Sequence, residues 1–142
     1  MWHCKSFHEL TTLELFRIYK IRTEVFVVEQ NCPYPEVDDN DLRALHLFYQ
    51  QDDEILAYAR IIPAESAVHF GRVLVAQSAR KGGVGRELVA RTLAEIERRH
   101  AGKPIHIQAQ EYLQGFYASL GFEAVSDVYL EDGIPHLDMV KE

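Results

Sequence analysis

The chain has 142 residues, of which 47% are hydrophobic and 26% are charged. This length and composition favour one packed domain spanning residues 1–142, and they exclude the biased compositions of disordered and fibrous proteins. The sequence holds 15 basic and 22 acidic residues, which gives a formal net charge of −7. An acidic surface repels phosphate groups. The charge therefore disfavours nucleic acid and an anionic membrane as partners, and it is compatible with a cationic substrate such as an amine.

The N-terminal sequence predicts no targeting signal. It lacks the apolar stretch of about 7–15 residues that a secretory leader carries, and no stretch approaches the roughly 18 apolar residues of a membrane span. The two cysteines, Cys4 and Cys32, are isolated in the sequence, so we expect reduced thiols rather than a disulfide. Together these features predict a cytoplasmic protein.

The first half of the chain predicts one helix among four strands. Thr11 and Glu14 have the spacing of a capping box, and they predict a helix that runs through Val28. Two prolines and several acidic residues predict a loop after this helix, over residues 31–41. Strands are expected on either side of these two elements, over residues 2–8, 46–50, 55–61 and 68–75.

After residue 84 the hydrophobic period changes from that of a strand to that of a helix. Apolar residues mark one face of a helix over residues 84–100, which Gly102 and Pro104 end. A short strand over 105–109 and another helix over 111–120 follow. Residues 122–140 predict two strands joined at Asp132-Gly133, a common hairpin turn. This order predicts an α/β fold in which a mixed sheet carries helices on its faces.

A glycine-rich basic loop, Arg80-Lys81-Gly82-Gly83-Val84-Gly85, lies between a predicted strand and a predicted helix. Glycines allow a sharp turn and a close approach of backbone N–H groups, and the helix start adds unpaired donors, so the segment suits a pyrophosphate. The Walker pattern fails because Arg86 and Glu87 follow Gly85, and the Rossmann pattern fails at Leu88. A plain strand-to-helix turn is the alternative for a loop of this kind.

Two motifs resemble those of the Gcn5-related N-acetyltransferases (GNAT). Arg80-x-x-Gly83-x-Gly85 resembles their acetyl-CoA pyrophosphate loop, and residues 110–122, ending in Phe-Tyr-x-x-x-Gly-Phe, resemble their last conserved strand-to-helix segment. The resemblance implies that Tyr117 donates a proton to the departing CoA thiolate, although Tyr117 also suits a core position. It further implies that Gln110 contacts the pantetheine arm, where Asn is usual in the family. The residues it assigns to acetyl-CoA binding are Val73, Leu74, Val75, Arg80, Lys81, Gly82, Gly83, Val84, Gly85, Gln110 and Tyr117.

Further segments, spread from about Glu9 to Met139, resemble the ElaA-like proteins, a bacterial GNAT subfamily. They include Arg22-x-x-Val25-Phe26-Val27-Val28-Glu29-Gln30, Gly71-Arg72-Val73 and Glu131-Asp132-Gly133-Ile134-Pro135-His136. The resemblance implies a single GNAT-type domain, α/β or α+β by classification. Its mixed, mostly antiparallel twisted sheet would have about seven strands, with helices on both faces. It does not define an acceptor, which is expected to be a small-molecule or peptide amine.

A GNAT reaction is the direct attack of an amine on the thioester carbonyl, and it needs a base because a protonated amine cannot attack. His69 is one candidate, since its imidazole titrates near neutrality and strand alternation predicts that it shares a face with Gly71, Val73 and Val75. A partly exposed strand histidine without a catalytic role is the alternative. Glu29 is the second candidate, with a structural carboxylate that accepts loop N–H groups as its alternative.

Other reactive side chains are less suited to chemistry. Asp38, Asp41, His46 and His136 lack the close spacing of metal ligands, so no metal site is predicted. Cys32 has no obvious histidine partner for an acyl-enzyme. Glu131, Asp132 and His136 are candidates to line the acceptor end. A non-catalytic CoA-binding or interaction module on the same fold remains the alternative to an enzyme, and the sequence is compatible with a monomer or a homodimer.

Overall fold

The computed structural model describes all 142 residues and contains one eight-stranded sheet. The strand order is β1-β2-β3-β4-β5-β8-β6, with β7 also paired to β8, and only β4 and β5 are parallel. The prediction of a mixed, mostly antiparallel sheet is confirmed. The strands are β1 (Trp2–Ser6), β2 (Leu45–Gln51), β3 (Glu54–Pro63), β4 (Val68–Val75), β5 (Ile105–Gln110), β6 (Glu123–Ala124), β7 (Tyr129–Glu131) and β8 (Ile134–Lys141).

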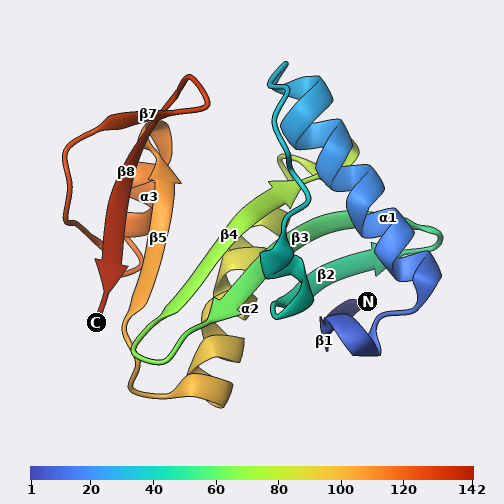
Figure 1. The fold of residues 1–142 in the computed structure, drawn as a ribbon, viewed down its shortest axis with the longest axis horizontal. Coiled ribbons are helices and arrows are strands. Elements are labelled where there is room, and N and C mark those ends of the chain that lie inside the picture. Colours follow the sequence, from blue (N-terminus) through green and yellow to red (C-terminus); the bar gives the residue numbers. More distant parts are fainter.

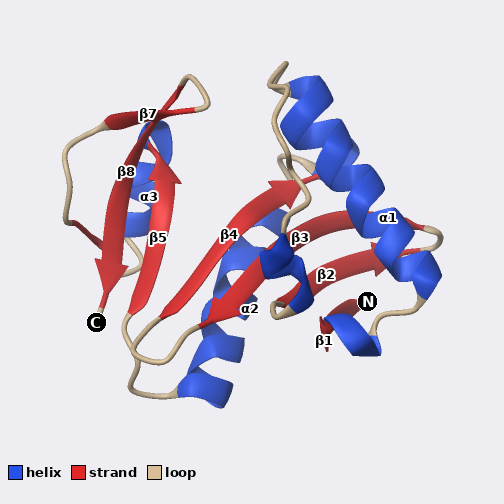
Figure 2. Cartoon of the chain, viewed as in Figure 1, coloured by secondary structure: helices blue, strands red, loops and turns tan.

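Helices cover both faces of the sheet, as predicted (Figures 1 and 2). Helix α1 (Thr12–Arg22), extended by the π-helix η2 (Thr23–Glu29), crosses one face, and α2 (Val84–His100) lies against the other. The third helix, α3 (Gln114–Ala118), lies beside β5 and β8. Short 3₁₀ turns complete the chain: η1 (Phe7–Glu9), η3 (Asp39–Leu42), η4 (Gln77–Ala79) and η5 (Glu111–Leu113). No helix has the length and apolarity that crossing a membrane requires.

The predicted capping box starts α1. The Thr11 hydroxyl accepts a hydrogen bond from the Glu14 amide at 3.0 Å, and the Glu14 carboxylate accepts one from the Thr11 amide at 2.8 Å. These bonds satisfy two N–H groups at the start of the helix, which explains why it begins here. The predicted end at Val28 also agrees with the structure, because the π-helix continues the chain to Glu29.

Three predicted elements differ from the structure. The first strand ends at Ser6, not at residue 8, because the Ser6 amide turns to the Glu9 carboxylate at 2.9 Å. The helix predicted over 111–120 is a 3₁₀ turn followed by a short α-helix, which ends before Gly121 at a φ of 98°. Residues 122–140 hold three strands and not two, because the two-residue β6 pairs with Met139 and Val140.

Strand β4 contains a bulge that positions the site. Gly71 pairs with Arg60 and Leu74 pairs with Tyr58, so Arg72 and Val73 together oppose a single residue, and Arg72 has a φ of 50°. The predicted common face of His69, Gly71, Val73 and Val75 is therefore wrong. The extra residue shifts the alternation, so that Val73 packs with the core under α2 while Leu74 packs with the core under α1.

Strands β4 and β5 pair only where they begin. Their parallel register joins Val68 to Ile105 and His69 to His106, and no pairing continues beyond these residues. From there the two strands diverge like the arms of a V, which Figure 1 shows at the centre of the sheet. One edge of β4 therefore carries backbone donors and acceptors without a neighbouring strand.

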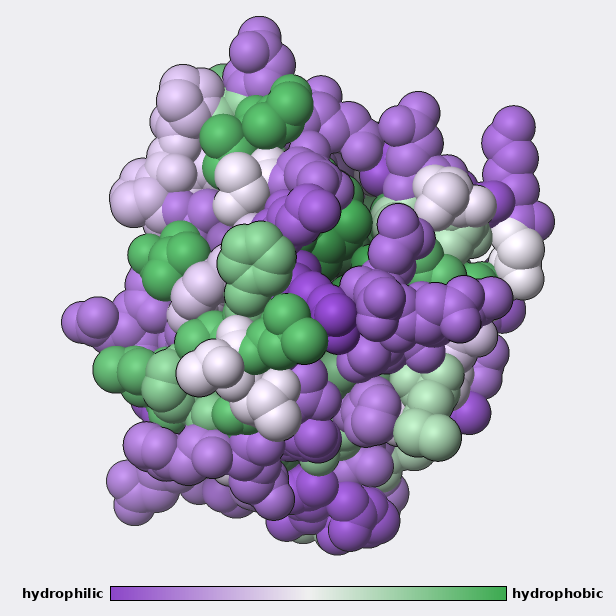
Figure 3. Space-filling model, turned by 90° about the vertical axis from the view of Figure 1, so that its right-hand side faces the viewer, coloured by the Kyte–Doolittle hydropathy of each residue, from purple (hydrophilic) through white to green (hydrophobic).

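Three apolar clusters hold the layers together. The largest lies between the sheet, α2 and α3, and a small one lies between the sheet and α2 around Leu88. The third lies between the sheet and α1, where Ile18, Phe48 and Tyr58 are fully buried. Leu13 and Phe16 of α1 remain exposed on the outer side. Figure 3 shows this side of the molecule as polar side chains interrupted by small apolar patches. Such scattered exposure is normal for a folded surface.

Candidate active site

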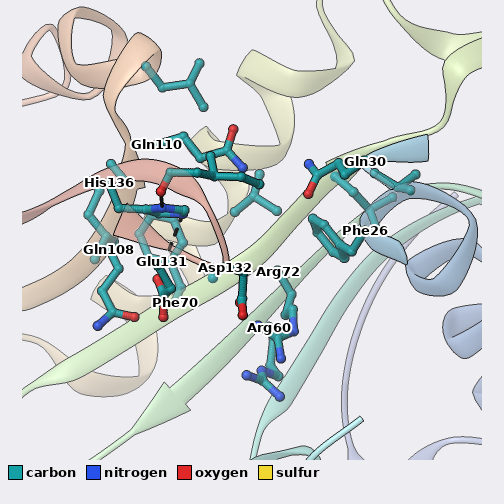
Figure 4. Close-up of a pocket in the computed structure, with 18 of the residues that line it drawn as sticks. Phe26, Gln30, Arg60, Phe70, Arg72, Gln108, Gln110, Glu131, Asp132 and His136 are labelled. Atoms are coloured by element: carbon teal, nitrogen blue, oxygen red, sulfur yellow. Dashed lines mark hydrogen bonds and ion pairs between the residues drawn. The ribbon is translucent and has the colours of Figure 1, made fainter. Parts of the chain in front are cut away.

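A cavity of about 870 Å³ lies where β4 and β5 diverge. Its lining comes from the end of η2 and the loop that follows it, from β3 and β4, from β5 with its following turn, and from the turn between β7 and β8. Figure 4 shows Gln108, Gln110 and His136 on one side and Phe26 and Gln30 on the other. The diverging strands β4 and β5 therefore lie on opposite walls of the same cavity.

The cavity brings together six of the residues predicted to bind acetyl-CoA. Val73, Leu74 and Val75 follow the bulge on one wall, and Gln110 and Tyr117 contribute to the other, while Arg80 lies beyond the end of β4. Residues 81–85 are outside the lining and form the turn into α2, where Gly85 approaches the side chain of Val75. The predicted loop thus begins where the cavity opens.

The glycine loop ends in an uncapped helix N-terminus. Gly83 has a φ of 80°, the left-handed conformation that glycine adopts without strain, and it precedes the first residue of α2. No side chain caps this helix, and the first bond into it runs from the Glu87 amide to the Gly83 carbonyl. The amides of Val84, Gly85 and Arg86 have no protein acceptor. An anion is the natural partner for such donors.

Arg80 and Glu29, predicted for pyrophosphate binding and for base catalysis, contact each other. Arg80 Nη1 is 2.6 Å from Glu29 Oε2 and Nη2 is 2.9 Å from Oε1, while Nε donates to the Val75 carbonyl at 3.0 Å. The hydrogen bonds and charge of Arg80 hold the pKa of Glu29 below its usual value. A carboxylate in this state is a weak base, which disfavours Glu29 as the proton acceptor.

Tyr117 is both a core residue and a lining residue. Its ring contacts Phe70, Phe116 and Phe122, and the side chain is almost completely buried. Burial raises the pKa of the Tyr117 hydroxyl to about 12. The two roles considered from the sequence are therefore compatible, because the hydroxyl stays protonated at neutral pH.

His69 is a solvent-exposed residue of the cavity lining, in the part of β4 that still pairs with β5. Its ring is 5.4 Å from that of His106, centroid to centroid, in the paired position on β5. Burial, His106 and Arg43 lower the pKa of His69. The imidazole is therefore neutral near pH 7 and able to accept a proton.

Three of the four acidic residues of the loop, Glu36, Asp38 and Asp41, are paired with arginines, and only Asp39 is exposed without an ion partner. Arg22 is completely buried, with Nε 2.9 Å from both carboxylate oxygens of Glu36 and Nη1 2.7 Å from Asp41 Oδ1. Arg60 Nη1 lies 2.6 Å from Asp38 Oδ1 and 3.2 Å from Asp41 Oδ1. These paired carboxylates therefore offer no free charge to a cationic ligand.

The same network anchors the loop to the strands below it. Arg72, at the bulge, is 2.6 Å from Glu36 Oε2 through its Nε, and its guanidinium lies over the Tyr34 ring at 5.4 Å. His46 bridges the Tyr58 hydroxyl at 2.6 Å and the Asp41 carbonyl at 2.9 Å. His46 and Asp41 therefore belong to a structural cluster, whereas His136 lies across the cavity on β8.

The turn between β7 and β8 carries Glu131, Asp132 and His136, the residues expected to line the acceptor end. All three line the cavity, and His136 Nε2 is 3.9 Å from Glu131 Oε2. Cys32 Sγ is 3.7 Å from the Asp132 carbonyl oxygen, so the loop after η2 reaches this turn across the cavity. Cys32 thus contacts a carbonyl rather than a histidine, in agreement with its exclusion as a nucleophile.

Sequence reasoning missed His106, Arg43 and the arginine network. His106 becomes visible only through the β4–β5 register, which no local pattern gives. Arg22, Arg60 and Arg72 stand in segments that resemble the ElaA-like proteins. The available signal was three arginines near three acidic residues of one loop, but their pairing spans 14 to 36 positions.

Proteins of the GNAT class have a single α/β domain in which two central strands diverge over a cavity, as they do here. Residues 20–142 match the family model described as "Acetyltransferase (GNAT) domain", and the chain belongs to this family. It is 46% identical over 138 residues to a UPF0039 protein of Schizosaccharomyces pombe, covering 95% of this chain and 92% of that protein.

Two further relatives agree with the ElaA-like resemblance. Protein ElaA of Escherichia coli is 40% identical over 146 residues, covering 99% of this chain and 95% of ElaA. A crystal structure described as an acyl-CoA N-acyltransferase from Pseudomonas aeruginosa is 44% identical. It covers 100% of this chain and 99% of that chain, with a TM-score of 0.96.

Proposed function

We propose that this protein transfers an acetyl group from acetyl-CoA to an amine by direct attack of the amine on the thioester. The observation that carries the proposal is the cavity between the diverging strands, whose lining reaches Arg80, four residues before the uncapped N-terminus of α2 at Val84. The polar walls of the cavity suit a long, narrow molecule such as acetyl-CoA. The free amides at the start of α2 suit an anionic group at one end of that molecule.

The unpaired edge of β4 supports binding of the pantetheine arm. Beyond His69 this strand has no partner on its β5 side, so its backbone groups are free to bond an extended chain carrying amides. Gln110, at the end of β5, offers a side-chain amide from the opposite wall. The amides of Val84 and Gly85, which have no protein acceptor, and Arg80 then bind the pyrophosphate.

The chemistry needs a base and a donor of a proton to sulfur. His69 is neutral near pH 7 and accepts the proton of the attacking ammonium. The amine nitrogen then bonds to the carbonyl carbon, and the carbon–sulfur bond breaks. Tyr117 donates a hydrogen bond to the departing thiolate, since its raised pKa keeps the hydroxyl protonated. The nitrogen loses its second proton as the amide forms, and the thiolate takes up one proton through the Tyr117 hydroxyl and leaves as the CoA thiol.

Binding of the donor is tested by the thermal midpoint in saturating acetyl-CoA. We expect a rise for the native chain, which Gly83→Glu abolishes by placing a carboxylate at the helix start. Gly102→Glu is the matched control, because Gly102 has a similar φ of 86° but lies at the opposite end of α2. Both variants carry the same backbone strain, so only the position of the new charge differs. No shift with the native chain refutes the proposal.

Catalysis is tested by release of free CoA thiol with a panel of amino acids, peptides, polyamines and aminoglycosides. Acceptor-dependent release supports an enzyme. Thermal stabilisation by acetyl-CoA, without thiol release for any acceptor, supports instead a CoA-binding module without catalysis.

A further inference from the structure

Four arginines line the cavity, and three of them have carboxylate partners. Arg60 pairs with Asp38 and Asp41, Arg72 pairs with Glu36, and Arg80 pairs with Glu29. Each pair removes most of the field that the arginine would exert on a ligand. The fourth arginine, Arg43, has no such partner, so it makes the electrostatic potential positive in the part of the cavity that it lines.

Arg43 is a cation with only a neutral partner. It follows the short helix η3, and the Asn40 side-chain oxygen accepts hydrogen bonds from its Nε at 2.9 Å and its Nη2 at 2.7 Å. The amide holds the guanidinium but leaves its full charge, and Arg43 takes part in none of the ion pairs of the structure. Its Nη1 has no protein acceptor. A fixed guanidinium with a free donor is suited to a carboxylate.

Arg43 lines the same cavity as the candidate base. His69 and His106 line it too, and both Arg43 and His69 are exposed to solvent there. The turn between β7 and β8 carries negative charge instead. There Asp132 has no cationic partner, and the only one near Glu131 is His136, at 3.9 Å. An acceptor in this space meets a positive group and two negative groups.

We propose that the acceptor carries a carboxylate as well as the reactive amine, as an amino acid or a short peptide does. Arg43 binds the carboxylate, while Glu131 and Asp132 attract the ammonium before His69 removes its proton. This inference rests on the proposed acetyl transfer and names the class of its acceptor. It adds a carboxylate to the cationic substrate with which the net charge is compatible, and Glu36, Asp38 and Asp41 are already paired with arginines.

The test uses matched acceptors that differ only in the carboxylate. Alanine, phenylalanine, lysine and glutamate are each compared with their α-amide and with the amine that lacks the α-carboxylate, and thiol release gives kcat/KM. Dipeptides ending in the same residues separate a free amino acid from a peptide. We expect the carboxylate form to exceed both analogues by about tenfold, as loss of one charge-assisted bond predicts.

Two variants assign that preference to Arg43. Arg43→Gln should raise KM about tenfold for the carboxylate acceptor and abolish the preference, while Arg43→Glu should reverse it in favour of the amine without carboxylate. Arg98→Gln removes an exposed arginine of α2 outside the cavity, and it should change neither quantity. Stabilisation by acetyl-CoA should be the same in all three variants.

The outcomes separate this inference from the proposed function. Thiol release that is equal for acid, amide and amine, or that occurs only with polyamines or aminoglycosides, overturns the inference and leaves acetyl transfer standing. A preference for the carboxylate that survives Arg43→Gln overturns the role of Arg43. Absence of both stabilisation by acetyl-CoA and thiol release refutes the proposed function itself, and the inference with it.

Discussion

Arg80 and Glu29 form a two-point ion pair at the opening of the cavity, with N–O distances of 2.6 and 2.9 Å. The arginine belongs to the loop suited to pyrophosphate, and the glutamate closes η2. A pyrophosphate that binds at the start of α2 competes with the Glu29 carboxylate for the same guanidinium. Binding of the acetyl-CoA pyrophosphate would therefore release Glu29 from Arg80, so the position of the end of η2 would depend on whether acetyl-CoA is bound.

Glu29→Gln should tighten acetyl-CoA binding and leave turnover nearly unchanged. A half-exposed ion pair contributes roughly 0.2–1 kcal/mol, so its loss should lower the Kd about two- to fivefold. The variant should keep its kcat, because the lowered pKa of Glu29 makes it a weak base. Titration calorimetry gives the Kd and thiol release gives the kcat.

Glu24→Gln provides the matched control for this variant, because Glu24 is an exposed residue of the same π-helix without an ion partner. Its Kd should equal that of the native chain. A kcat that falls a hundredfold in Glu29→Gln, with normal binding, would identify Glu29 as the base.

Local signals in the sequence were sufficient for the parts of the fold set by residues close along the chain. The Thr11–Glu14 capping box acts over three positions, and Asp132-Gly133 forms the predicted hairpin with φ values of 52° and 77°. Gly83 likewise adopts the positive φ that its loop implied. In each case the preferred backbone conformation depends on the residues themselves.

The features that the sequence did not predict depend on pairing between distant segments. The bulge at Arg72 arises from the register of β4 against β3, and a one-residue shift reverses which side chains share a face. The His69–His106 contact needs the β4–β5 register. The network around Arg22 joins side chains 14 and 19 positions apart. Alternation and composition alone do not encode these relationships.

His69→Gln should lower kcat by about a hundredfold, the lower range for loss of a general base. In the native chain, the pKa of His69 lies below its usual 6.5, because burial, His106 and Arg43 disfavour the charged form. The imidazole must be neutral to act, so kcat should be level from pH 6.5 to 8 and fall only at lower pH. A pH profile of kcat at saturating acceptor measures this limb.

His8→Gln is the control, since His8 is exposed and outside the cavity. His106→Gln should raise the pKa of His69 and move the acidic limb to higher pH, because one of the causes of the low value is removed. A native profile whose limb lies above pH 7 excludes His69 as the base.

Asp41→Asn should destabilise the fold by about 3–5 kcal/mol, the usual cost of removing one partner from a buried charged cluster. Asp41 is 1% exposed and pairs with both Arg22 and Arg60, which would lose a charged acceptor. Asp53→Asn is the control, because Asp53 is 93% exposed and 3.4 Å from Arg17. Its effect should be within about 0.5 kcal/mol. Urea unfolding measures the free energy of unfolding of both variants.

The pH dependence of this effect follows from the lowered pKa of Asp41, which its bonds to Arg22 cause against the opposing effect of burial. A carboxylate of this kind stabilises the fold above its unfolded pKa, near 3.8, and the stabilisation is lost as pH falls through the lower folded value. The difference between Asp41→Asn and the native chain should be constant from pH 5 to 8. A difference that shrinks near pH 6 would contradict the assigned charge state.

Tyr117→Phe should lower kcat while leaving the Kd for acetyl-CoA unchanged. The substitution keeps the ring among Phe70, Phe116 and Phe122 and removes only the hydroxyl, so packing is preserved. Loss of a hydrogen bond to the departing thiolate should reduce kcat about tenfold to a hundredfold. Because burial raises the pKa of Tyr117 to about 12, the native kcat should show no alkaline limb from this residue up to pH 9.

Tyr112→Phe is the matched control, because Tyr112 also lines the cavity but is exposed and five positions earlier in the chain. It should keep the native kcat. If Tyr117→Phe abolishes acetyl-CoA binding, the hydroxyl holds the donor rather than the leaving group. If kcat is unchanged, solvent protonates the thiolate, and Tyr117 acts only as one aromatic ring in the core beside β4.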